Sequence, residues 1–492
     1  MRAQSADAAL RRLAALTDWE RSTRRGMRVD GAPCADLLRL LGAPHRAFRT
    51  IHVAGSKGKG TVSTLLGAAL ESAGWRTGVF TSPHVESMRE RLRIDGELWC
   101  ESELGRALHA AADAREAAAA QGSAGARATR FDAMVAAALW SMRAARIDWG
   151  VVECGLGGRH DSTAELGAEL AVLTSVELEH TEVLGSTLGA IASEKAGIVS
   201  RGGSLVAAVA GEAATQAERV ARERGAAMLV LVNPSDDPLG PSGNLATARA
   251  ALDLLGRCGA RCGPGLRASV STPGQKRQSR PARRRAGDGI EGERHYGEGV
   301  VPGPPRRLGG WLLDTEATRA EAASRLPARQ ECRVSPCGVR VLLDGAHTAA
   351  SAAALVGAIR GVAPPPGVSR TPPVVLVGLA AEKDAAAFAA ALRGARPALC
   401  VATAAGPAGG RADGDGSGAA ESAAAPCVPP AELASALAIA GCGTEHRVAH
   451  EIGRALELAL GEARERGTWL LVVGSFRLCG EIRNKIACRE IA

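Results

Sequence analysis

The first half of the chain alternates short apolar runs with longer segments in which apolar residues recur every three or four positions. Buried strands are predicted by the short runs at 51–54, 76–80, 149–153 and 170–174. Helices are predicted by the periodic segments at 5–16, 61–73, 103–120, 130–145 and 188–198. Two more strand–helix units follow between 204 and 255. Strands that alternate with helices indicate a parallel sheet with crossover helices.

The same alternation restarts later in the chain and predicts a second α/β unit with its own core. A chain of 492 residues is in any case too long for a single core. Predicted strands lie at 338–343, 374–379, 399–402 and 469–473, and predicted helices at 350–359, after 384, and at 448–465. We place the boundary near 326–334, with a first domain over 1–326 and a second over 334–492.

Two segments show no periodicity and are interpreted as insertions in these domains. The first is a Pro/Gly-rich stretch at 261–307, and the second is an Ala/Gly/Pro tract at 404–430 that we expect to be a surface loop. The net charge of +8 suggests a nucleic-acid partner, but the 261–307 stretch holds eleven Lys/Arg and four Asp/Glu, a net of +7. Because the excess charge is confined to one aperiodic stretch, a solvated loop is favoured over an RNA-binding or membrane-binding surface.

The composition is that of a globular protein, with 46% hydrophobic and 23% charged residues. Aromatic residues make up only 3%, so packing is expected to depend on Ala, Val and Leu. No apolar run reaches the roughly 18 residues of a membrane span, and residues 1–4 lack the apolar core of a secretory signal. The twelve cysteines are scattered without a CxxC pair, which favours reduced thiols in the cytoplasm over disulfides or zinc.

The segment 50–62 reads as a strand, a glycine-rich loop and the start of a helix. Such a loop turns backbone N–H groups toward a phosphate, and the helix N-terminus adds positive dipole. We expect Lys59 to contact the β/γ-phosphates of a bound nucleotide and consider Thr61 a candidate magnesium ligand. The predicted phosphate-binding residues are Gly55, Ser56, Lys57, Gly58, Lys59, Gly60 and Thr61. A glycine-rich turn with surface lysines is the alternative, because Gly60 stands where the common P-loop has Ser or Thr.

Polar side chains follow several of the predicted strands, where active sites of parallel sheets are found. They are Ser82, His84, Glu153, His180, Asp344 and His347. Glu153 ends an apolar strand before three glycines, which makes it a candidate cation ligand. A carboxylate bonded to the N–H groups of the following turn is an equal alternative. For His180 and His347 taken alone, an ordinary hydrogen-bonded role is favoured.

Taken together, the motifs resemble the folylpolyglutamate synthase / dihydrofolate synthase family, a branch of the Mur ligase superfamily. The loop has the form GSKGKGT, and the other matching motifs occur in order between about 50 and 480. They are Thr81-Ser-Pro-His84, Glu90-Arg91, Glu153-Cys-Gly-Leu-Gly-Gly-Arg-His-Asp-Ser-Thr163, Glu179-His-Thr-Glu-Val-Leu-Gly185, Glu194-Lys-Ala-Gly-Ile198, Pro327-Ala-Arg329, Asp344-Gly-Ala-His347 and Val473-Gly-Ser-Phe476. The fold this implies is a P-loop-type parallel-sheet ATPase domain followed by a smaller Rossmann-like α/β domain.

The resemblance also implies roles for individual residues. ATP would be held by Lys59 and the loop backbone, with Asn244 near the base, although Asn244 is equally interpreted as a helix cap. Two Mg²⁺ ions are implied, one held by Thr61, Ser82 and Glu153, the other by His180, Glu153 and a carbamylated Lys195. The alternative for Lys195 is an ordinary helical lysine beside Glu194. From the second domain, the nucleotide would be approached by Arg329, Asp344 and His347.

Some positions depart from the family pattern. Ala164 stands after Asp-Ser-Thr163 where Asn is usual, PGR is Pro-Ala-Arg329, and DGAHNP is Asp-Gly-Ala-His-Thr-Ala. These departures leave the phosphate and metal groups in place and affect the expected adenosine and glutamate contacts.

The function implied is an ATP-dependent amide ligase that adds L-glutamate to a folate-type carboxylate through an acyl phosphate. Dihydropteroate, a folyl-glutamate or both would be the acceptor, and the protein is expected to be a cytoplasmic monomer. One alternative is a Mur-type ligase of cell-wall precursors, which would normally bring an N-terminal domain larger than residues 1–49. Another is a non-enzymatic nucleotide- or RNA-binding protein that uses the basic stretch.

Overall fold

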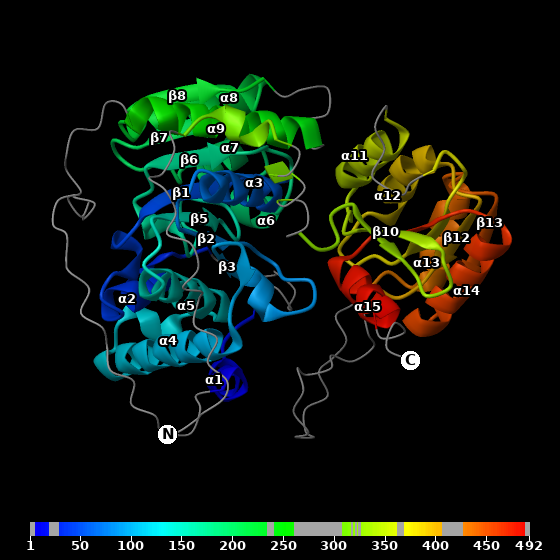
Figure 1. The fold of residues 1–492 in the computed structure, drawn as a ribbon, viewed down its shortest axis with the longest axis horizontal. Helices are drawn as coiled ribbons and strands as arrows, with labels where there is room; N and C mark the ends of the chain where they lie inside the picture. The colour runs from blue at the N-terminus through cyan, green and yellow to red at the C-terminus, as the bar shows by residue number, and fades with distance from the viewer. Residues whose placement is uncertain are drawn as a thin grey trace, which may run out of the picture.

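The computed structural model describes residues 5–18, 29–233, 241–259, 308–315, 318–319, 322, 326–361, 369–405 and 427–487, and every structural statement below concerns these residues. Two α/β units lie side by side, each built on its own sheet (Figure 1). The predicted basic stretch at 261–307 lies outside the described residues, as does most of the predicted loop at 404–430.

The first unit is built on an eight-stranded sheet in the order β4-β3-β2-β5-β1-β6-β7-β8. Its strands are β1 (Arg49–Ala54), β2 (Thr77–Phe80), β3 (Leu92–Ile94), β4 (Glu97–Leu98), β5 (Trp149–Glu153), β6 (Leu170–Leu173), β7 (Ser204–Ala207) and β8 (Met228–Leu231). β1 lies in the middle, parallel to both β5 and β6. β3 pairs antiparallel with both β2 and β4 at one edge, while the other strand pairs are parallel, so the prediction of a parallel sheet is confirmed for most of its strands. The connection from β2 to β3 carries one 3₁₀ turn but no crossover helix, so the chain reverses direction there.

Helices cover both faces of this sheet, which is why its central strands are buried along almost their whole length. They are α1 (Ala6–Leu13), α2 (Ala32–Leu40), α3 (Lys59–Ser72), α4 (Glu101–Gln121), α5 (Arg130–Ala144), α6 (Thr181–Leu184), α7 (Leu188–Ala196), α8 (Gly211–Glu223) and α9 (Pro241–Gly259). α3 and α9 share one apolar core with β1 and β5. α1, α2, α4 and α5 form a second core, and α7 and α8 a third.

The second unit has a six-stranded sheet in the order β13-β12-β11-β14-β10-β9. Its strands are β9 (Glu331–Val334), β10 (Arg340–Asp344), β11 (Val374–Val377), β12 (Leu399–Ala402), β13 (Glu445–Val448) and β14 (Leu470–Val473). All of these strands are parallel except β9, which pairs antiparallel with β10 at one edge of the sheet. This sheet is therefore also mostly parallel, as predicted, with one antiparallel strand at its edge.

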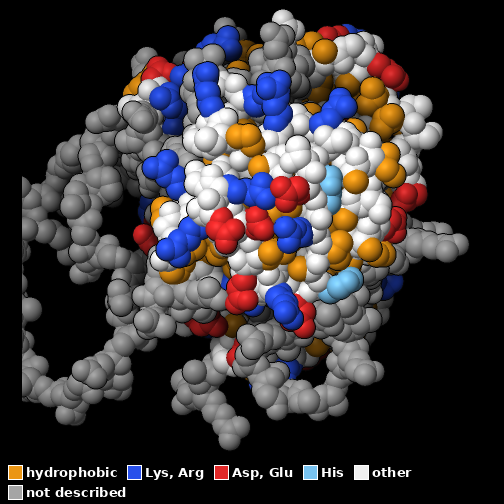
Figure 2. Space-filling model, turned by 90° about the vertical axis from the view of Figure 1, so that its right-hand side faces the viewer, with side chains coloured by type: hydrophobic (Ala, Val, Ile, Leu, Met, Phe, Trp, Pro, Cys, Tyr) orange, Lys and Arg blue, Asp and Glu red, His pale blue; other side chains and the backbone are white. Residues whose placement is uncertain are grey.

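The helices of the second unit divide between the two faces of its sheet. They are α11 (Ala349–Arg360), α12 (Ala385–Leu392), α13 (Pro430–Ile439), α14 (Ile452–Glu465) and α15 (Phe476–Ala487). α11, α12 and α13 pack on one face, and α14 and α15 on the other. Among the described helices, none combines the length and apolar character needed to cross a bilayer. Acidic and basic side chains are intermixed over the middle of the face shown in Figure 2.

Candidate active site

The loop between β1 and α3 has the backbone shape that its glycines predict. Gly58 has φ +81°, and a Cβ there would lie 2.2 Å from Asn244 Oδ1. Gly55 has φ +150°, and a Cβ there would lie 2.0 Å from Thr174 Oγ1. Both positions combine a backbone conformation that L side chains rarely adopt with a close neighbour, so each requires glycine. The loop ends where α3 begins, at Lys59.

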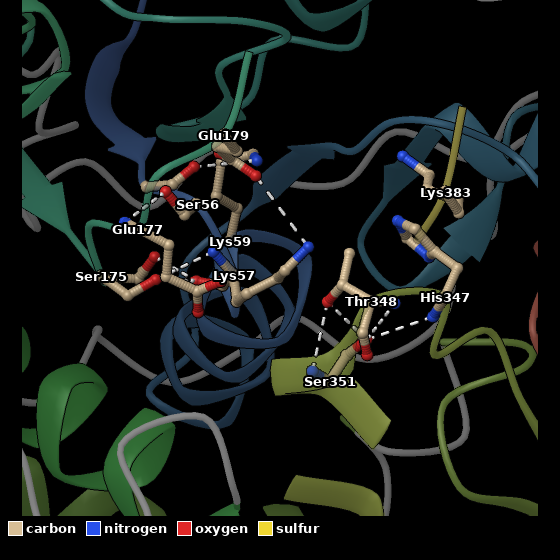
Figure 3. A network of polar contacts seen from close by, with 12 residues as sticks. Ser56, Lys57, Lys59, Ser175, Glu177, Glu179, His347, Thr348, Ser351 and Lys383 are labelled. Carbon is tan, nitrogen blue, oxygen red and sulfur yellow. Dashed lines mark hydrogen bonds and ion pairs between the residues drawn. The ribbon is translucent and has the colours of Figure 1, made fainter. Parts of the chain in front are cut away.

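Hydrogen bonds to the segment after β6 hold this loop in place (Figure 3). Lys57 N donates to Ser175 Oγ at 2.8 Å, and Glu177 N donates to Ser56 Oγ at 3.0 Å. The Nζ atom of Lys59 turns back over the loop and donates to Gly55 O at 3.0 Å. The segment 175–177 thus holds the loop, and an ammonium group lies over the loop backbone.

Glu153, at the end of β5, is a buried carboxylate that faces the start of α3. Its side chain is joined to the neighbouring strand end, because Ser82 N donates to Glu153 Oε2 at 3.1 Å. Burial raises the pKa of Glu153, and the positive charges of Lys59 and Arg329 oppose that rise. The turn that follows β5 bonds instead to Asp161, which accepts from the N–H groups of residues 155 and 156. The carboxylate that accepts from the N–H groups of this turn is therefore Asp161 and not Glu153, which was the alternative considered for Glu153.

Residues from the two sheets meet over Gly60. A Cβ at Gly60 would lie 3.4 Å from Glu153 Oε2 and 3.6 Å from an Nη atom of Arg329. Arg329 comes from the turn before β9 in the second unit, and its guanidinium lies 5.0 Å from the centre of the Phe476 ring. A carboxylate of the first unit and a guanidinium of the second therefore flank the N-terminus of α3.

Lys195, on α7, lies buried behind the loop. Its Nζ donates to Gly55 O at 3.2 Å and lies 3.1 Å from Glu179 Oε1. Burial lowers the pKa of Lys195, and the positive charge of Lys59 lowers it further. Burial would raise the pKa of Glu179, but Lys195, Lys59 and Lys57 together lower it to about 2. An ion pair between Lys195 and Glu179 thus closes the rear of the loop.

Asp344 is the last residue of β10 and His347 follows it, on the side of the second unit that faces the loop in Figure 3. Asp344 accepts hydrogen bonds from Gln330 N at 3.0 Å and Ala346 N at 2.8 Å, while burial raises its pKa to about 6. His347 Nδ1 lies 2.8 Å from Gly345 O, so this nitrogen carries the proton. Burial, with the positive charge of Lys57, lowers the pKa of His347 to about 4 and keeps its ring neutral at pH 7.

The structure brings most of the predicted residues to this one place. Asn244 contacts the loop at Gly58 and is not a helix cap, since α9 begins three residues earlier at Pro241. Thr61 lies in the first turn of α3, and His180 precedes α6 with φ +49°. Among the described residues no three His, Cys, Asp or Glu side chains form a metal cluster, so both metal sites remain predictions.

Several residues near the loop were not among the predicted site residues. Glu177 and Glu179 lie beside Lys57, and the positive charge of Lys383 reaches Lys57 from the second unit (Figure 3). Glu179 stands in the motif with His180, and Lys383 stands in a Glu-Lys-Asp sequence after β11, so position after a strand was the available signal.

Comparisons with known proteins agree with the motifs. No family model matches the chain. The dihydrofolate synthase/folylpolyglutamate synthase of Bacillus subtilis is 37% identical over 192 residues, which cover 39% of this chain and 44% of that protein. The protein of the same name from Escherichia coli is 40% identical over 146 residues, covering 30% and 33%. The resemblance to this family is thus confirmed, although the chain spans less than half the length of the curated relatives it matches.

Solved structures share the fold over nearly the whole chain. E. coli FolC in complex with DHPP and ADP has a TM-score of 0.69 at 24% identity, covering 99% of this chain and 98% of that one. A Yersinia pestis bifunctional folylpolyglutamate synthase/dihydrofolate synthase with AMPPNP and Mn has a TM-score of 0.66 at 22% identity, covering 98% of each. At these identities the likeness confirms the fold alone: two α/β units, each built on a mostly parallel sheet.

Proposed function

We propose that this chain is an ATP-dependent ligase that joins L-glutamate to a folate-type carboxylate through an acyl phosphate. The proposal rests on one observation: the Glu153 carboxylate and the Arg329 guanidinium both lie beside Gly60, in the first turn of α3. Phosphoryl transfer needs positive charge around the phosphate and reactants held in line. Charges from both units converge on this point, so the reaction would depend on the two domains acting together.

ATP would lie along the loop and the start of α3. The backbone of residues 55–60 and the helix dipole favour phosphate there, and Lys59 would contact the β/γ-phosphates. Asn244, which lies against Gly58, would mark the nucleotide side of the loop. On the other side, Arg329 would neutralise the charge of the transferred phosphoryl group.

The residues around Glu153 fit a magnesium ion. Glu153 is a carboxylate that is 2% exposed, and burial raises its pKa, which a bound divalent cation would reverse. Thr61 and Ser82 add hydroxyl oxygens, and an all-oxygen set suits Mg²⁺. We infer that Thr61, Ser82 and Glu153 hold this ion, which when bound neutralises the phosphate charge and orients it.

A second cation would involve His180, Glu153 and Lys195. Burial lowers the pKa of Lys195, which makes it easier for the ammonium of the Lys195–Glu179 ion pair to lose its proton and give the neutral amine that reacts with CO₂ to form a carbamate. A carbamate there would place a second anion beside Glu179, and a cation between the two would offset their repulsion. The burial of Lys195 and its lowered pKa thus support the carbamylation that the family resemblance implies, with a bound cation as its requirement.

The chemistry follows in two steps. A carboxylate oxygen of the folate-type substrate attacks the γ-phosphorus of ATP, the bond to the bridging oxygen breaks, and ADP leaves. The amine of L-glutamate then attacks the acyl carbon, inorganic phosphate leaves, and the nitrogen loses its proton to solvent. Asp344, held by two backbone N–H groups, would orient the second domain's contacts to ATP. His347 presents a neutral Nε2 as an acceptor, and we assign it no role as a base.

We further propose that the protein works as a cytoplasmic monomer on small molecules. The twelve cysteines are scattered along the chain without a CxxC pair, which is the sequence feature that supports a reducing compartment.

ADP release tests the proposed function. The assay contains ATP, Mg²⁺ and L-glutamate, and offers dihydropteroate and tetrahydrofolate in separate reactions. Glutamate-dependent ADP release with one or both acceptors is expected, with a product heavier by one glutamyl residue. Failure of both acceptors with the folded protein would refute the proposal, and the acceptor that works identifies the substrate.

A further inference from the structure

Arg483, on α15, lies between two carboxylates that belong to different units. One of its Nη atoms is paired with Glu86, in the segment after β2, and its Nε donates to Glu331 Oε1 at 2.9 Å at the start of β9. The three side chains are between 18% and 24% exposed. Ion pairs this far out of water are costly to break from one side, because a charge is left without its partner.

The Glu86 end of this bridge belongs to the segment that carries Ser82. The Glu90 carboxylate accepts from Val85 N at 2.7 Å and Glu86 N at 2.9 Å, which holds the segment in one shape. Four residues before Glu86, Ser82 N donates to the Glu153 carboxylate. A displacement of Glu86 is therefore passed along a short, fixed segment to Glu153.

The Glu331 end belongs to the turn that carries Arg329. Glu331 Oε2 accepts from Ala328 N at 2.9 Å, so its carboxylate fixes the residue next to Arg329. The backbone of α15 rests on the first unit beside the same bridge, where a Cβ at Gly480 would lie 2.7 Å from Val85 O. Arg483 thus joins the two segments that deliver Ser82 and Arg329 to the site.

We propose that Arg483 is a positioning residue that sets how Arg329 of the second domain lies against Glu153 of the first. The inference rests on the proposed function, since it assigns Arg483 to the same reaction. Without Arg483, Glu331 would keep its ion pair with Arg333 at 2.7 Å, whereas Glu86 would lose the ion pair that ties it to the second unit, and the contact between the domains would loosen. Displacement of a phosphate-neutralising group by about 1 Å is enough to cost up to a hundredfold in rate.

Three variants test this bridge: Arg483→Met, Glu86→Gln and the two combined. Either single change is expected to lower kcat between about tenfold and a hundredfold, with little change in the KM for ATP, because the phosphate loop lies within the first unit. The double variant is expected to lose no more than the worse single variant, since both remove one interaction. Arg483→Lys keeps the charge, serves if Arg483→Met folds poorly, and is expected to lose less.

The matched control is Arg466→Met. Arg466 also bridges two carboxylates, Glu445 and Glu462, but all three lie within the second unit. Its loss is expected to leave turnover unchanged. A second readout does not depend on turnover: hydrogen exchange at the N–H groups of residues 85–87 should speed up in Arg483→Met and not in Arg466→Met.

Each outcome decides the proposal. Faster exchange at 85–87 together with reduced kcat supports it. Unchanged exchange, or faster exchange with wild-type turnover, overturns it. Losses that multiply in the double variant also overturn it. If the wild-type chain itself shows no turnover, the proposed function fails, while the exchange experiment still reports whether Arg483 couples the two domains.

Discussion

Replacement of Gly60 by alanine is expected to separate stability from activity. Gly60 lies in the first turn of α3, its carbonyl accepts a hydrogen bond from Thr64 Oγ1 at 2.7 Å, and its φ lies outside the left-handed region. Alanine is favoured over glycine in a helix by about 0.5–1 kcal/mol. The new Cβ would lie 3.4 Å from Glu153 and 3.6 Å from Arg329, which is ordinary contact. The free energy of unfolding should therefore stay unchanged or rise by up to about 1 kcal/mol.

The same methyl group would occupy the space between Glu153 and Arg329, where the proposed function places phosphate oxygens. We expect turnover to fall by about a hundredfold, because a reacting group displaced by about 1 Å loses its alignment. Urea unfolding measures the stability, and glutamate-dependent ADP release measures the turnover.

Two other glycines provide matched controls. At Gly357, in α11, a Cβ would meet nothing within 4 Å, so Gly357→Ala should stabilise slightly and leave turnover unchanged. At Gly67, in α3, a Cβ would lie 2.4 Å from Val79 Cγ2, so Gly67→Ala should destabilise by about 1–3 kcal/mol without impairing the folded enzyme. Wild-type turnover in Gly60→Ala would refute the placement of the reaction over Gly60, and lowered stability would refute the helix estimate.

Three further predictions concern charge. Lys59→Ala should reduce turnover by on the order of 10²-fold or more, and full ATP-dependent turnover would contradict the role of Lys59. Chelation by EDTA should abolish ADP release, and added Mg²⁺ should restore it; activity that survives chelation would exclude the metal proposal. The raised pKa of Asp344, about 6, means that folding takes up a proton between about pH 4 and 6, so stability falls as pH rises through that window. Asp344→Asn should reduce this pH-dependent loss in the free energy of unfolding by about 1–3 kcal/mol. An unchanged pH profile of urea unfolding would contradict this expectation.

Much of the fold was predictable from local pattern. The strands at 149–153 and 399–402 have the predicted bounds, because buried central strands are short, uniformly apolar runs. Eight helices and strands were not predicted: α2, α6, α13, α15 and the strands β3, β4, β9 and β13. Except for the helices, these are edge or near-edge strands with polar or mixed sequences, whose hydrogen bonds depend on the neighbouring strand and leave little trace in periodicity.

The candidate site divides in the same way. The glycine loop could be read directly, since positive φ at Gly58 and a helix start at Lys59 are local properties of the chain. Asn244 could not, because its neighbour Gly58 is distant in sequence and only the packing of α9 beside α3 brings them together.

The sequence by itself determined the order of the buried strands and of most helices around them, the glycine-rich loop after β1 and the identity of the charged residues at strand ends. Only the tertiary structure decided which of those charges meet. Arg329 lies over Gly60 and Arg483 reaches Glu86, 397 positions away, because two separately formed cores dock along one edge. Hydrophobic periodicity indicates which face of a helix or strand is buried. Contacts between the two units depend instead on how the whole units pack against each other, and no single segment of the sequence determines that packing.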